Sequence, residues 1–125
     1  MKQSFFVPGK LPGQNDILAA AKSGGGKTNA YHRLKIYWEG IIVQYIRAAN
    51  IKPMDSARIT FLWVEANKRR NPDNIAAAKK FLIDAMVTAG IFQNDGWNQI
   101  LGFDDGWVLG DHPGVYVRLT DYEGG

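Results

Sequence analysis

The chain of 125 residues contains no cysteine. Disulfide bridges, thiolate zinc sites and cysteine nucleophiles are therefore excluded. No apolar stretch approaches the roughly 20 residues that a helix needs to cross a bilayer. The opening residues, MKQSFFVPGK, hold only a short apolar run, whereas a signal peptide requires a longer apolar core. We therefore expect a soluble, cytoplasmic protein with no membrane partner.

A strong excess of charge of one sign is also absent, because the formal net charge is only +3. The distribution of the cations is more informative than their sum. Lys68, Arg69 and Arg70 form a basic run before a predicted helix, and Lys79 and Lys80 follow within it. Such runs are usually solvated surface, but a phosphate site needs cations beside metal-binding carboxylates. The basic run is therefore a candidate contact for a nucleic-acid backbone.

The composition, 46% hydrophobic and 22% charged, is that of one ordinary globular domain, which we assign to residues 1–125. Apolar periodicity predicts helices and strands, with a long loop at 12–29 that includes at most a helical turn at 17–22. The predicted strands are 4–7, 56–65, 106–109 and 115–120, and the predicted helices are 31–49 and 72–89. This order predicts an α/β (α+β) fold in which two helices pack on a small mixed sheet.

The helix predicted at 72–89 carries the most distinctive pattern. Asn71 is a favourable N-cap, Pro72 suits the first helical position, and Gly90 is placed to end the helix. At about 100° per residue, Asp73, Lys80 and Asp84 fall within roughly 40° of one another. The apolar residues lie opposite. One helix would therefore show solvent a line of acid, base and acid.

Carboxylates with a lysine suit phosphodiester hydrolysis. Mg²⁺ prefers oxygen ligands and is commonly held by one or two carboxylates and a substrate phosphate. Asp73 lies in the first helical turn, and Asp95 could reach it only through tertiary structure. Each feature also has a structural interpretation: Asn-Pro-Asp is an ordinary helix start, and Asn94-Asp95-Gly96 is a common turn.

Two other motifs are weaker. The run 24–28, GGGKT, resembles the end of a phosphate-binding loop, but Ala21 stands where that pattern needs glycine. We therefore expect no nucleotide cofactor, and expect Lys27 to contact a DNA backbone. Asp104, Asp105 and Asp111 are interpreted as solvated loop acids rather than as a second metal cluster.

The run RRNPDNIAAAKKFLIDAMVTAGIFQNDGW resembles the RusA-type Holliday-junction resolvases, in particular their phage-encoded branch. The similarity extends to VPGKLPGQND and to DHPGVYVRL, so it covers most of the chain. It implies a homodimeric α/β endonuclease in the host cytoplasm. Such an enzyme would bind four-way junction DNA and use Mg²⁺ or Mn²⁺ to make paired nicks. A twofold dimer is physically reasonable, because a junction has two equivalent strands to cut.

By position, the resemblance makes Asp73 and Asp95 catalytic aspartates and Lys80 the catalytic lysine, with Lys79 as a competitor because of a three-residue insertion. The family's first catalytic aspartate falls on Asn71, which is a weaker metal ligand. The chain is therefore either a nuclease or a junction-binding protein without cleavage. The implied metal ligands are Asp73, Asp95, Asn71 and Asp84. The implied DNA contacts are Lys68, Arg69, Arg70, Asn74, Lys79 and Lys27.

Overall fold

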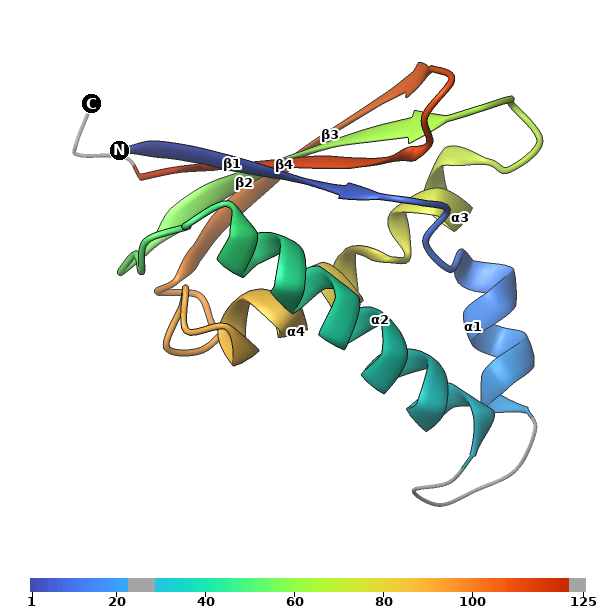
Figure 1. Ribbon diagram of the computed structural model, residues 1–125, viewed down its shortest axis with the longest axis horizontal. Coiled ribbons are helices and arrows are strands. Elements are labelled where there is room, and N and C mark those ends of the chain that lie inside the picture. The colour runs from blue at the N-terminus through green and yellow to red at the C-terminus, as the bar shows by residue number, and fades with distance from the viewer. Residues whose placement is uncertain (23–28, 122–125) are drawn as a thin grey trace.

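One mixed four-stranded sheet organises the molecule in the computed structural model, which describes residues 1–22 and 29–121 (Figure 1). Its strands are β1 (Lys2–Pro8), β2 (Ala57–Glu65), β3 (Ile100–Leu109) and β4 (Gly114–Thr120). Their order is β1-β4-β2-β3. β4 is antiparallel to both β1 and β2, whereas β2 and β3 are parallel. The predicted mixed sheet and α+β fold class are confirmed.

The helices are α1 (Gln14–Ala21), α2 (Ala30–Ala48), α3 (Pro72–Ala76) and α4 (Lys79–Thr88). Parallel strands need a crossover connection, and α3 and α4 supply the one between β2 and β3. Figure 1 shows α2 and α4 beneath the same face of the sheet. No helix of the described residues is long and apolar enough to cross a membrane.

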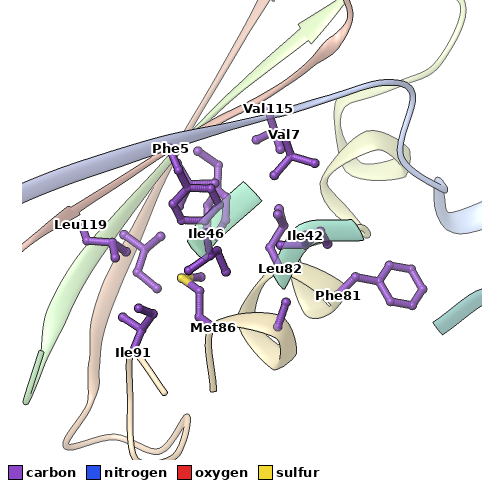
Figure 2. Close-up of a cluster of buried hydrophobic side chains, with 14 of the residues drawn as sticks. Phe5, Val7, Ile42, Ile46, Phe81, Leu82, Met86, Ile91, Val115 and Leu119 are labelled. Atoms are coloured by element: carbon purple, nitrogen blue, oxygen red, sulfur yellow. The ribbon is translucent and has the colours of Figure 1, made fainter. Parts of the chain in front are cut away.

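The core lies between the sheet and the pair α2 and α4. Alternation along β2 and β4 directs every second side chain toward the helices, and Val115, Val117 and Leu119 of β4 are buried. The helices contribute a matching apolar stripe. Figure 2 shows side chains of the two layers facing one another. The buried residues at this contact include Phe5, Val7, Val115, Val117, Leu119, Ile42, Ile46, Leu82 and Met86.

The prediction of one helix over 72–89 is wrong, because the chain turns at Ala77 and Ala78 between α3 and α4. The amide of Ala78 donates to the carbonyl of Ile75, three residues earlier, at 3.3 Å. This three-residue spacing makes a tighter turn than the four-residue spacing of an α-helix. Alanine is the best helix former, so residues 76–78 do not themselves require a break. Ile75 and Phe81, on the two sides of the turn, are both buried, and we attribute the break between the two helices to this packing. Asp73 and Lys80 therefore belong to different helices.

Two further expectations are corrected. Residues 14–21, expected within a loop, form α1, where the Asp16 carboxylate accepts the Gly13 amide and Ile17 packs on the core. β3 begins at Ile100 rather than at 106. Glycines and aspartates disfavour a strand, but parallel pairing with β2 imposes one. The glycine-rich run and Lys27 fall in 23–28, outside the described residues.

Candidate active site

A hollow of about 310 Å³ between α2, α4 and the following loop is lined by several of the predicted site residues. We call it the α2–α4 hollow. Among the residues predicted from sequence, Lys80, Asp84 and Asp95 line it. Lys35 and Glu39, which sequence reasoning missed, complete the charged part of its wall. Both come from α2, which the sequence pattern marked only as an amphipathic helix.

Two ammonium groups surround Asp84 at the base of this hollow. The nitrogen atoms of Lys35 and Lys80 lie 3.6 Å and 3.4 Å from its Oδ2 atom. This oxygen is buried and accepts no hydrogen bond from the described residues. Lys80 and Asp84, which the sequence pattern placed on one helical face, are therefore in contact. Because the side chain of Lys80 is 67% exposed, its ammonium group remains accessible to a phosphate.

Hydrogen bonds connect residues at the rim of the α2–α4 hollow. Thr88 Oγ1 donates to Glu39 Oε1 at 2.6 Å, which links α4 to α2. The Asn94 side chain accepts the Gly96 amide at 2.8 Å, so the expected turn at Asn94-Asp95-Gly96 is present. Asp95 stands exposed on that turn. Asp95 therefore lines the edge of the hollow.

A second hollow, of about 260 Å³, lies between the start of α3 and the end of β3, and we call it the α3–β3 hollow. Asn71 and Lys68 line it together with Trp107. Asn71 is the N-cap residue of α3, but its side chain makes no capping hydrogen bond. The side-chain amide of Asn71 is exposed and does not cap the helix, although the sequence suggested that it would. Asp73 follows on α3, also exposed.

The α3–β3 hollow lies at the end of β2 and β3, whereas the Asp95 edge of the α2–α4 hollow belongs to the loop that leads into the start of β3. Asn71 and Asp73 follow the end of β2, whereas Asp95 precedes the start of β3. β2 has nine residues, which at about 3.3 Å each separates its ends by roughly 30 Å. The described residues contain no group of three or more His, Asp or Glu that could hold a metal. One chain alone therefore does not bring Asp73 and Asp95 around a shared ion.

Arg70, an expected DNA contact, is instead bound within the chain. Its Nε and Nη2 atoms donate to the two carboxylate oxygens of Glu65 at 3.1 Å and 2.9 Å. Its Nη1 atom donates to the carbonyl of Leu11 at 3.0 Å. The side chain is only 12% exposed. Lys68 and Arg69 are the exposed cations of this basic run.

Asn74 and Lys79 are also engaged by other parts of the fold. Asn74 Oδ1 accepts the backbone amide of Asn15, which attaches α3 to α1. The Lys79 ammonium group donates to Asp105 at 2.8 Å and lies 4.6 Å from the centre of the Phe103 ring. Lys79 is therefore held against β3, away from the α2–α4 hollow. Between the two competing lysines, the structure favours Lys80 as the one that can reach a substrate.

Asp104 and Asp105, expected as loop acids, lie in β3 instead. The Arg58 guanidinium donates to Asp104 at 2.7 Å and 3.2 Å. This hydrogen bonding is the main cause that lowers the pKa of Asp104. Burial opposes it, and the attraction of the Arg58 and Arg118 charges adds to the lowering. Asp105 accepts from Lys79 and from Trp63 Nε1. These contacts account for both acids without a second metal cluster.

The chain matches no family model, and no curated protein is significantly similar to it. Evidence for a function therefore lies in the residues around the two hollows.

Proposed function

We propose that this protein is a metal-dependent endodeoxyribonuclease that acts as a homodimer on four-way DNA junctions. The observation that carries this proposal is that Asp95, from the loop after α4, lines the same hollow as Lys80 and Asp84 of α4. Carboxylates beside an accessible lysine suit a phosphate group whose negative charge grows during hydrolysis. The family resemblance of the same sequence block points to the same chemistry.

The residues have distinct roles in this proposal. Mg²⁺ or Mn²⁺ would activate water and stabilise charge on the phosphate. Asp73 and Asp95 would be its main ligands, with Asn71 and Asp84 as weaker or outer ligands. Lys80 would neutralise the phosphate.

Asp84 would also position Lys80. Its carboxylate lies 3.4 Å from the lysine nitrogen, one helical turn away. With Lys35 on the other side, Asp84 attracts both cations and would keep the Lys80 side chain over the hollow. The exposed Lys68 and Arg69 would attract the DNA backbone.

Two copies of the protein would be needed to bring Asp73 and Asp95 to the same metal ion. Because Asp73 and Asp95 occupy opposite ends of one chain, an ion bound by both must take them from different copies. One or two carboxylates with waters and a phosphate are sufficient for Mg²⁺. A twofold dimer would then hold two equivalent sites, which matches the two equivalent strands of a junction.

Asn71 favours a second candidate function, a junction-binding protein that does not cleave. Its amide is exposed in the α3–β3 hollow, where the resemblance implies a carboxylate. An amide lacks the charge with which a carboxylate attracts a divalent ion. Binding would then persist while cleavage is lost.

The test is a fixed four-way junction incubated with the wild type, Asn71→Asp and Asp73→Asn, in Mg²⁺ or in EDTA. Asp55→Asn, which removes an exposed carboxylate outside both hollows, is the matched control. We expect paired nicks from the wild type and the control in Mg²⁺, more from Asn71→Asp, and binding without nicking from Asp73→Asn. Nicking only by Asn71→Asp would establish the second candidate. The absence of any mobility shift at low salt would refute both.

A further inference from the structure

Among the described residues, Trp97 is the most exposed large apolar side chain, at 97%. The next is Tyr37, at 63%. Aromatic side chains of this size normally bury much of their surface in a core or an interface, because that burial is strongly favourable. Packing within the chain therefore does not explain a tryptophan at this position, whereas a ligand that covers the ring would.

The backbone that carries Trp97 is ordered and attached to the sheet. The Gln99 carbonyl accepts the amide of Ala57, at the start of β2, at 2.8 Å. The Gly96 carbonyl accepts the amides of Gln99 and Ile100 at 3.2 Å and 3.0 Å. Trp97 thus lies within a hydrogen-bonded turn. Because this turn is already formed, a ligand that contacts the ring does not have to order the backbone first.

The ring stands alone among polar neighbours on its loop. Apart from Trp97, residues 93–99 are glutamine, asparagine, aspartate and glycine. A protein partner usually covers a contiguous apolar patch, which these residues do not supply. A nucleobase needs only one flat face, and proteins commonly hold unpaired bases by stacking them on exposed aromatic side chains. The neighbours of Trp97 on the loop therefore favour a base over an apolar protein surface.

Trp97 also lies next to the candidate active site. Asp95, two residues earlier, lines the α2–α4 hollow together with Lys80. Two residues span at most about 7 Å of chain. The proposed function assigns Lys80 to the phosphate, and each phosphate of a DNA strand is joined through its sugar to a base. A strand bound at this hollow therefore brings its bases within reach of the Trp97 ring.

We propose that Trp97 stacks on the exposed face of a nucleobase at the branch point of junction DNA. The inference rests on the proposed function for the location of the DNA. Inside a continuous duplex, neighbouring base pairs cover both faces of each base. At an open branch point, the innermost bases lack a neighbour on one side. Trp97 therefore adds affinity for branched or unpaired DNA, whereas cations that contact phosphates attract any DNA.

The first test separates the base from the backbone. Binding is measured in EDTA, which keeps the DNA uncut, to a 12-nucleotide thymidine strand and to an abasic strand with the same number of phosphates. We expect the wild type to prefer the thymidine strand. Trp97→Ala should bind that strand about fivefold more weakly or worse, and bind the abasic strand like the wild type. Trp97→Phe, which keeps a flat ring, should retain much of the preference.

The second test concerns selectivity for the branch point. Affinities for a fixed four-way junction and for a linear duplex of equal length are compared in EDTA. Trp97→Ala should weaken binding to the junction by a similar factor and leave binding to the duplex unchanged. Tyr37→Ala is the matched control, because it removes an exposed aromatic side chain of α2 outside the α2–α4 hollow. It should bind both ligands like the wild type.

The fold is not at risk in these variants, because an almost fully exposed ring contributes little to packing. Trp97→Ala should therefore melt at the wild-type temperature and sediment like the wild type. Equal affinity of the wild type for the two strands would overturn the inference, as would an equal loss in Tyr37→Ala. A change of oligomeric state in Trp97→Ala with the base preference intact would also overturn it, since the ring would then contact protein.

These outcomes are distinct from failure of the proposed function. A wild type that nicks junctions in Mg²⁺ but shows no preference for bases rejects the stacking role alone. A wild type that prefers bases through Trp97 but never nicks DNA supports the stacking role and rejects the nuclease.

Discussion

Replacing Arg70 by methionine should destabilise the fold strongly. The substitution keeps much of the aliphatic stem but removes three hydrogen bonds, two to Glu65 and one to the Leu11 carbonyl. It also leaves the Glu65 carboxylate, whose side chain is 13% exposed, without its cation. Breaking one partner of a buried ion pair costs about 3–5 kcal/mol.

The slight exposure of both side chains places the expected loss at the lower end, about 3 kcal/mol. For a chain of this length, that corresponds to a fall in melting temperature on the order of 10 °C. Urea unfolding followed by far-ultraviolet circular dichroism measures the change. Arg69→Met removes an exposed cation nearby and should stay within about 0.5 kcal/mol of wild type.

The double variant Glu65→Leu with Arg70→Met should recover much of the loss, because no unpaired charge remains. Equal stability of Arg70→Met and Arg69→Met would refute the structural role of Arg70. Junction affinity separates the two arginines further. While folded, Arg70→Met should bind four-way DNA nearly as well as wild type, whereas Arg69→Met should bind more weakly and with a smaller salt dependence.

Two other substitutions test local features of the fold. Gly40→Ala should stabilise the protein by about 1 kcal/mol in the same unfolding assay, because Gly40 is inside α2 and a Cβ there meets no atom within 4 Å; lower stability would contradict this. The lowered pKa of Asp104 means that its carboxylate contributes stability above the ordinary aspartate pKa, which is lost as pH falls through the lowered folded-state value. Asp104→Asn should therefore melt with a weaker dependence on pH over that acidic range, and an unchanged dependence would show that the Arg58 contact is not formed in solution.

The sequence correctly predicted those helices and strands whose apolar pattern fits only one kind of secondary structure. One core buries the alternating apolar residues of β2 and β4 and the apolar face of α2, so prediction and structure agree for these elements. The contact between Lys80 and Asp84 was also predictable, because residues four apart share a helical face.

Features that depend on tertiary partners could not be predicted from sequence. The alanines at 76–78 fit a continuous helix, and only the separate burial of Ile75 and Phe81 breaks it. Arg70 and Lys79 looked like surface cations until the fold placed Glu65 and Asp105 beside them. Lys35 and Glu39 join the α2–α4 hollow from another helix, which no spacing along 71–95 could indicate.

The separation of Asp73 and Asp95 has a similar cause. Asp73 lies in the first crossover helix and Asp95 follows the second, so their relative position depends on whether the joined strands are parallel or antiparallel. In a parallel pair, one residue follows the first strand and the other precedes the second, so they lie at opposite ends. Sequence suggested two strands but not their relative direction.

The position of β4 in the sheet has a consequence for how the protein folds during synthesis. β4 follows every other strand in the chain, yet it lies between β1 and β2 and is the neighbour that joins them. As the ribosome releases the chain from its N-terminus, β1 has no partner and β2 has an open side until residues 114–120 emerge. Contacts this distant in sequence slow folding and leave apolar strand surface uncovered meanwhile. Nascent chains that end before β4 should therefore be the forms that most need chaperones.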